Sequence, residues 1–156
     1  MSIEQARAHL ARFGAADRII ELDASSATVE LAASALGVEP ARIAKTLAFA
    51  TKDGPVLVVA AGDARMQNRA FKDTFGEKMR MLPREEAEQQ IGHPAGGICP
   101  FGVRPGVRVY LDESLRRFET VYPACGSTNS AIEVSLPELE HFAAPANWVN
   151  LSSVPD

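Results

Sequence analysis

The sequence contains few cysteines, no long apolar run and no excess of positive charge. Its 156 residues include only two cysteines, Cys99 and Cys125, which excludes the disulfide framework of small secreted domains. The longest strongly apolar run, 56–61, is far shorter than the ~20 residues that a membrane-spanning helix needs. The first seven residues also lack the basic and apolar pattern of a secretory signal. We therefore expect a cytoplasmic protein in a reducing compartment, with no membrane contact.

Positive charge is scarce overall but concentrated in one segment. Sixteen basic and twenty acidic residues give a net charge of -4, so a protein that coats duplex nucleic acid by charge alone is excluded. Six basic and two acidic residues nevertheless lie between residues 65 and 84, whereas no Lys or Arg follows Arg117. The basic segment is either an ordinary solvated surface or a face that meets an anion, such as an RNA end.

Helical and strand patterns alternate along the chain, which predicts a mixed α+β fold with a central sheet of six or seven strands. The clearest signal is a hairpin, because the apolar runs 46–51 and 56–61 flank an Asp-Gly turn. Residues 92–106 hold five of the eleven glycines and three of the ten prolines, which predicts a long ordered loop. Further patterns predict helices at 3–13, 26–36, 68–75, 83–88 and 137–142, and strands at 18–22, 78–82, 107–111, 118–122 and 131–135. We expect one domain over residues 1–156.

Within this loop, residues 96–102 (GGICPFG) could present backbone N–H groups to a developing oxyanion without any side-chain nucleophile. The alternative is a tight surface turn. Cys99 follows His93 by six residues, so a thiolate activated by imidazole is a second possibility. A small buried residue is the simpler interpretation of Cys99 and of Cys125. The cysteines and histidines show no paired ligand spacing, so we expect no metal site.

Lys45 is the second candidate for chemistry. It stands at the entrance of the first hairpin strand, among Ile43, Ala44 and Leu47. A lysine in apolar surroundings either extends to solvent or meets a partner. Lys45 is therefore either a surface residue at the edge of a strand or a cation that holds a carbonyl, phosphate or ribose group.

Three segments in this order resemble the YbaK/EbsC family of aminoacyl-tRNA deacylases. They are 43–47 (IAKTL), 96–102 (GGICPFG), and 118–122 (FETVY) followed by Gly126-Ser127 and 131–134 (AIEV). The family includes the editing domain inserted in bacterial prolyl-tRNA synthetases and its free-standing relatives, and the likeness spans nearly the whole chain. The resemblance implies a largely antiparallel sheet curled around a small pocket and flanked by helices. It also implies hydrolysis of the ester that joins a wrong amino acid to the 3′ end of tRNA.

The resemblance further implies the roles of individual residues. The family's near-invariant lysine falls on Lys45, and its Gly-x-x-x-Pro loop falls on Gly96, Gly97, Ile98, Cys99 and Pro100. Water would attack the ester, the N–H groups of Ile98 or Cys99 would hold the oxyanion, and a ribose hydroxyl of the substrate would orient the water. No cofactor is implied. Pocket residues by family position are Leu22, Asp23, Thr28, Phe49 and Ala61, with Gly126 and Ser127.

These assignments leave alternatives open. Leu22, Phe49 and Ala61 could equally be ordinary core, and Thr28 could be a helix cap. Some relatives carry an acidic residue where Ala131 stands here, and Glu133 could replace it, because strand alternation keeps Glu133 on the same face as Ala131. The usual family targets are alanyl- and cysteinyl-tRNA-Pro, with the tRNA 3′ end and a synthetase as expected partners. The competing functions are a non-catalytic module that binds tRNA or a synthetase, and a Cys99-dependent hydrolase of small molecules. The sequence leaves the oligomeric state open.

Overall fold

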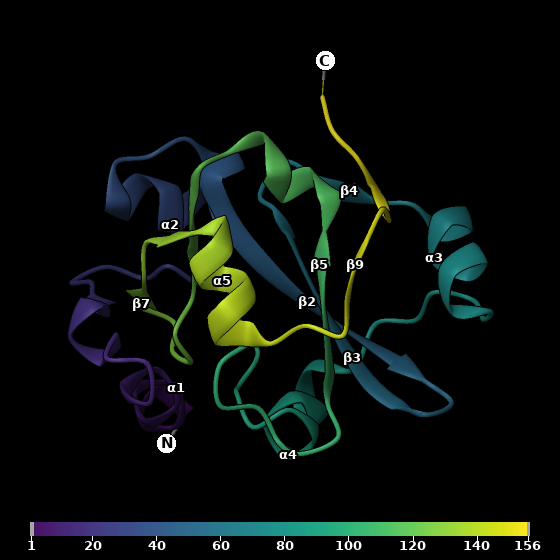
Figure 1. Cartoon of the computed structure of the whole chain (residues 1–156), viewed down its shortest axis with the longest axis horizontal. Helices are drawn as coiled ribbons and strands as arrows, with labels where there is room; N and C mark the ends of the chain where they lie inside the picture. The colour runs from purple at the N-terminus through teal and green to yellow at the C-terminus, as the bar shows by residue number, and fades with distance from the viewer. Residues whose placement is uncertain (1, 156) are drawn as a thin grey trace.

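A six-stranded mixed sheet forms the centre of the structure, a computed structural model that describes residues 2–155 (Figure 1). Its strand order is β8-β6-β2-β3-β5-β9. The bounds are β2 (Ile43–Thr51), β3 (Gly54–Ala61), β5 (Arg108–Asp112), β6 (Thr120–Pro123), β8 (Val134–Ser135) and β9 (Asn147–Val149). Two short antiparallel pairs accompany it, namely β1 (Ile20–Glu21) with β7 (Ser130–Ala131) and β4 (Arg65–Met66) with β10 (Ser152–Ser153). Across all described pairings four are antiparallel and three are parallel, which confirms the mixed α+β class.

The predicted hairpin is the centre of this sheet. β2 and β3 pair antiparallel from Thr51↔Gly54 to Ala44↔Ala61, and Gly54 takes the positive φ of 110° that the tight turn requires. Every residue from Val56 to Ala61 is fully buried, as the continuous apolar run predicts.

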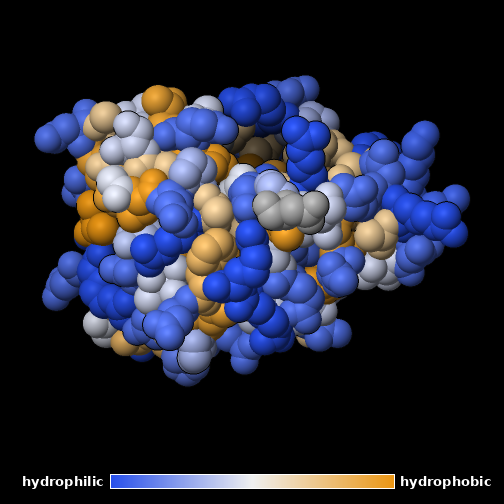
Figure 2. All heavy atoms as spheres, turned by 90° about the horizontal axis from the view of Figure 1, so that it is seen from above, coloured by the Kyte–Doolittle hydropathy of each residue, from blue (hydrophilic) through white to orange (hydrophobic). Residues whose placement is uncertain are grey.

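Helices cover both faces of the sheet. α1 (Ser2–Ala11), α5 (Leu136–Ala143) and the 92–106 loop pack on one face, where Leu10, Phe101 and Leu139 join the larger core. α3 (Asn68–Phe75) packs on the other face, where Phe71 meets Phe49. α2 (Val29–Leu36) covers the start of β2 through a small cluster of its own. α2 and α3 lie at opposite ends of the molecule, and in Figure 2 apolar atoms gather at the α2 end while the α3 end is mostly hydrophilic.

Several predicted elements are shorter than expected. α2 begins at Val29 rather than at residue 26, because the Thr28 hydroxyl accepts from the Leu31 N–H and caps the helix there. The helix predicted at 83–88 forms as a 3-10 turn, η3 (Arg84–Glu86), that runs directly into α4 (Ala87–Gln90). The strand predicted at 78–82 is reduced to an isolated bridge between Phe49 and Met81. The 92–106 loop contains neither helix nor strand, as predicted. No described helix is long and apolar enough to cross a membrane.

Candidate functional site

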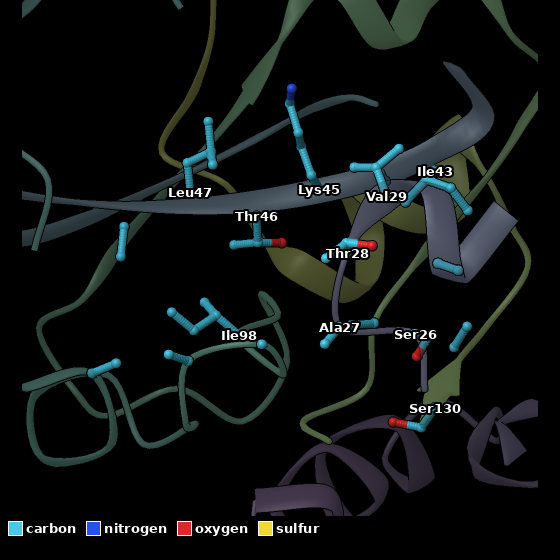
Figure 3. A pocket seen from close by; sticks show the side chains of 18 of the residues that line it. Ser26, Ala27, Thr28, Val29, Ile43, Lys45, Thr46, Leu47, Ile98 and Ser130 are labelled. Atoms are coloured by element: carbon cyan, nitrogen blue, oxygen red, sulfur yellow. The ribbon is translucent and has the colours of Figure 1, made fainter. Parts of the chain in front are cut away.

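A pocket of about 310 Å³ opens beside the first half of β2 (Figure 3). Its walls come from five parts of the chain: β2 residues 43–48, the segment leading into α2, the glycine-rich loop (residues 92–106), the segment that runs from Met81 into α4, and the stretch from β6 to β7. Apolar side chains line most of it. The polar groups that line it include Ser26, Thr28, Lys45, Thr46 and Ser130.

The pocket lies at a gap in the edge of the sheet. β6 pairs with β2 only at Ile43 and Ala44. Further along the same edge, segment 80–82 lies beside β2 in place of β6. The Leu82 N–H donates to Ala48 O and the Ala50 N–H donates to Arg80 O, both at 2.9 Å. Residues 45–47 therefore have no strand neighbour on this edge.

Thr46 is the residue that this gap leaves unpaired. Alternate residues of a strand direct their N–H and C=O groups to the same edge. Because Ala48 and Ala50 direct theirs to segment 80–82, Thr46 directs its own into the gap. The Thr46 Oγ1 atom is also buried and has no hydrogen-bond partner among the described residues. A buried hydroxyl without a partner is unusual, and at a pocket wall it is available to a ligand or a water.

The glycine-rich loop faces Thr46 across the pocket. Figure 3 shows the Thr46 side chain on the Ile98 side of β2. Gly97 lets the loop pack directly on Gly126 and Ser127, because a Cβ on Gly97 would lie 2.8 Å from the Ser127 N atom. The Gly97 N–H donates to Pro94 O, whereas the N–H groups of Ile98 and Cys99 donate to no other described residue. Ile98 lines the pocket, so its N–H is available to an acceptor there, as an oxyanion site requires, whereas Cys99 lies behind the lining.

Cys99 lies outside the pocket lining and is fully buried. Burial raises the pKa of its thiol to about 12, so the thiolate that a nucleophile needs is not formed near pH 7. Its Sγ donates to Phe101 O, and the His93 Nε2 donates to the same oxygen at 2.7 Å. Burial lowers the pKa of His93 and raises that of Cys125. His93 and Cys99 thus hold the loop closed from the inside, and Pro100 is buried beside them.

Lys45 borders the pocket but extends away from Ile98, on the other side of β2 (Figure 3). Its Nζ donates to Ala64 O at 2.5 Å and to Gly62 O at 3.3 Å, in the turn between β3 and β4. Burial lowers the Lys45 pKa from its usual value, and the nearby Asp63 carboxylate opposes that change. An ammonium carries three donors, so one N–H of Lys45 remains for another acceptor.

The other predicted pocket residues fall into three groups. Thr28 lines the pocket and also caps α2. Gly126 and Ser127 lie behind the loop, and the Ser127 hydroxyl bonds to that of Ser130, which does line the pocket. Besides Gly126 and Ser127, four predicted pocket residues are not part of the lining: Phe49 and Ala61 are fully buried in the core, and Leu22 and Asp23 precede the lining segment 26–29.

Glu133, the acidic residue considered as a replacement near the third motif, lies outside the pocket. Ala131 lines the pocket, but Glu133 does not. The Glu133 carboxylate accepts from the Thr120 hydroxyl at 3.1 Å and lies 3.7 Å from Arg42, in a separate surface hollow. Strand alternation does not carry from Ala131 to Glu133, because β7 ends at Ala131 and β8 begins at Val134. Among the described residues, no group of three or more His, Cys, Asp or Glu side chains could hold a metal ion.

Reasoning from the sequence missed Thr46, Ser130, Met81 and Arg84, all of which line the pocket. Thr46 was detectable in part, since strand alternation places it on the opposite face from Lys45. Its lack of a partner depends on the gap between β6 and segment 80–82, which no local pattern reveals.

Comparison with known proteins is consistent with this geometry. The chain is 47% identical over 152 residues to the uncharacterized protein YwhH of Bacillus subtilis (strain 168), covering 97% of each chain. It is 33% identical over 90 residues to proline–tRNA ligase of Thermotoga sp. (strain RQ2), a match that covers 57% of this chain and 15% of the ligase. A solved structure described as a proposed trans-editing enzyme for prolyl tRNA synthetase superposes with a TM-score of 0.87 and 27% identity, over 97% of both chains. The family model of the aminoacyl-tRNA editing domain matches residues 23–142, and the chain therefore belongs to the aminoacyl-tRNA editing domain family.

Proposed function

We propose that this protein hydrolyses the ester of a mischarged aminoacyl-tRNA, with tRNA-Pro as the tRNA. The observation that carries the proposal is the gap in the edge of β2, where Thr46 faces the Gly96–Ile98 loop across a small pocket. The family match and the likeness to part of a proline–tRNA ligase support the substrate class.

The reaction needs little beyond positioning. An aminoacyl ester is already activated, so orientation and charge stabilisation can suffice without a protein nucleophile. Water attacks the ester carbonyl, and the developing oxyanion accepts from the N–H group of Ile98 in the pocket wall rather than from that of the buried Cys99. A free ribose hydroxyl of the substrate orients the water. The ribose oxygen that held the amino acid leaves with a proton, which yields a free amino acid and an uncharged tRNA.

β2 supplies the other contacts with the substrate. Thr46 offers its hydroxyl, N–H and C=O at one point of the pocket wall. Lys45 directs its remaining N–H donor to a carbonyl, phosphate or ribose oxygen of the terminal nucleotide. The largely apolar lining and the small volume suit a small side chain, such as that of alanine or cysteine.

The same pocket could serve a non-catalytic module that binds tRNA or a synthetase. A Cys99-dependent hydrolase is disfavoured, because the thiol is buried outside the lining with a raised pKa. We further propose that residues 1–156 act as one domain in the cytoplasm, in trans to a prolyl-tRNA synthetase.

Deacylation of alanyl-, cysteinyl-, seryl- and prolyl-tRNA-Pro tests the function. We expect hydrolysis of one mischarged species, sparing of prolyl-tRNA-Pro, and full turnover by Cys99→Ala, which keeps the backbone N–H. Activity that disappears in Cys99→Ala with the fold intact would establish the thiol mechanism instead. No hydrolysis of any species, together with tRNA binding, would establish the non-catalytic module.

A further inference from the structure

The segment that closes the gap on one side also forms a rim of the pocket. Met81, Leu82 and Arg84 line the pocket, and residues 78–80 continue from them along β2 toward the tip of the β2–β3 hairpin. We call residues 78–84 the rim segment. Since it connects the pocket with the outer surface, a polymer whose end occupies the pocket can follow it outward.

Cations recur along the rim segment. Lys78, Arg80 and Arg84 are all exposed. None of their side chains forms an ion pair or a hydrogen bond with another described residue. Two acidic neighbours form hydrogen bonds elsewhere, since Glu77 accepts from the Lys52 N–H at 3.2 Å and Glu86 accepts from Gln90, while the exposed Glu85 directly follows Arg84. Lys78 and Arg80 therefore present two positive charges that no ion pair among the described residues engages.

The direction of these side chains follows from the strand-like pairing. Met79 packs into the core on the α3 face, whereas Leu82 packs into the core on the loop face. By alternation Lys78 and Arg80 project on the same side as Leu82, whereas Met81 projects on the side of Met79. Alternate residues of an extended segment lie ~6.6 Å apart, so the cations are spaced along the path as a row.

Met81 adds an apolar contact at the pocket mouth. Its side chain is 53% exposed, more than that of any other large apolar residue among those described. A flexible thioether at the mouth of a pocket is well suited to pack against an aromatic ring. A nucleobase supplies such a ring next to a phosphate.

We propose that the rim segment binds the single-stranded RNA end that leads into the pocket, with Lys78 and Arg80 on successive phosphates along one side of the segment and Met81 against a base at its other side, by the pocket mouth. This inference rests on the proposed function, because it assumes that the terminal ribose occupies the pocket. It adds the path by which the rest of the strand leaves the protein. The alternative is that the rim segment binds a protein, such as a synthetase, rather than RNA. The test distinguishes these two results.

The test compares two double variants that each remove two positive charges. Lys78→Ala/Arg80→Ala alters the rim, and Arg69→Ala/Lys72→Ala alters exposed, unpaired cations on α3, which packs against the other face of the sheet. We expect the rim variant to raise KM for aminoacyl-tRNA roughly tenfold, because two exposed phosphate contacts are lost. The dependence of log KM on log salt should become shallower by about 1.4, since each single-strand phosphate contact contributes about 0.7. The α3 variant should have the same KM and the same salt dependence of KM as the wild type.

A second substrate and a binding assay make the result decisive. On an aminoacyl ester of adenosine, which has no phosphates, the rim variant should raise KM far less than it does on aminoacyl-tRNA. If both double variants change KM alike, the effect is one of net charge and the rim proposal is overturned. If the wild type hydrolyses nothing, the proposed function fails. The affinity for uncharged tRNA, measured by fluorescence anisotropy, then tests the rim proposal independently of activity. If the wild type and the rim variant bind tRNA with equal affinity, the rim proposal is overturned. This holds even if a synthetase binds the wild type more tightly than the rim variant.

Discussion

At the residue scale, the site depends on two neighbouring side chains that serve opposite faces of one strand. Lys45 stabilises the turn between β3 and β4, while Thr46 faces the pocket with an unpaired hydroxyl. A motif can identify such residues but not their contacts. Lys45 was predicted from its apolar surroundings and its family position, whereas Thr46 becomes notable only once the strands that flank β2 are known.

The unpaired hydroxyl of Thr46 gives a test in which activity and stability change in opposite directions. Thr46→Val removes a buried polar group that has no partner, so the free energy of unfolding should stay the same or rise by about 1 kcal/mol. Loss of a hydrogen bond to the substrate should lower kcat/KM about tenfold.

Urea unfolding and deacylation kinetics measure the two effects, with Thr46→Ser as the control that keeps the hydroxyl. A Thr46→Val protein with wild-type kcat/KM would remove Thr46 from the site.

At the element scale, local signals predicted some elements and not others. The β2–β3 hairpin, α3 and the glycine-rich loop follow from turn residues and apolar periodicity close in the sequence. β4, β9 and β10 were not predicted, because strands of two or three residues are defined by their partners rather than by their own pattern. The strand predicted at 78–82 is instead the rim segment, which pairs at one bridge only.

The glycine-rich loop is closed from within by a neutral histidine, which predicts a dependence of stability on pH. Burial lowers the pKa of His93 below its unfolded value of about 6.5. Below that pH the unfolded chain binds a proton that the folded chain does not, so stability falls as the pH falls from 7.5 toward 5.5.

His93→Gln keeps a side-chain N–H for Phe101 O but does not titrate, so its unfolding midpoint should vary less over this range. Identical pH profiles for wild type and His93→Gln would contradict this account.

At the scale of the whole molecule, one buried carboxylate joins the C-terminal segment to the central sheet. Asp112, at the end of β5, is fully buried. It accepts from the Leu151 N–H at 2.8 Å, the Ser152 hydroxyl at 2.6 Å and the Ser114 N–H at 3.0 Å. No local pattern predicts the contact with Leu151, because Asp112 and Leu151 lie 39 residues apart in the chain.

Asp112→Ala should therefore destabilise the protein by about 3 kcal/mol, since three donors lose their acceptor. Hydrogen exchange should show the Leu151 amide opening before the core of β3. Asp112→Asn, which keeps one acceptor oxygen, should lie between the wild type and Asp112→Ala. An unfolding midpoint unchanged in Asp112→Ala would show that the C-terminal segment is held by other contacts.

The whole account rests on the claim that the pocket beside β2 hydrolyses a mischarged tRNA. The most direct test is hydrolysis of alanyl- and cysteinyl-tRNA-Pro by the wild type beside Lys45→Ala, with Lys52→Ala, an exposed lysine of the hairpin turn, as the control. We predict rapid hydrolysis of one substrate by the wild type and Lys52→Ala, and a loss of at least tenfold in Lys45→Ala with the fold retained. Equal hydrolysis by all three proteins would contradict the role of Lys45, and no hydrolysis by the wild type would contradict the central claim.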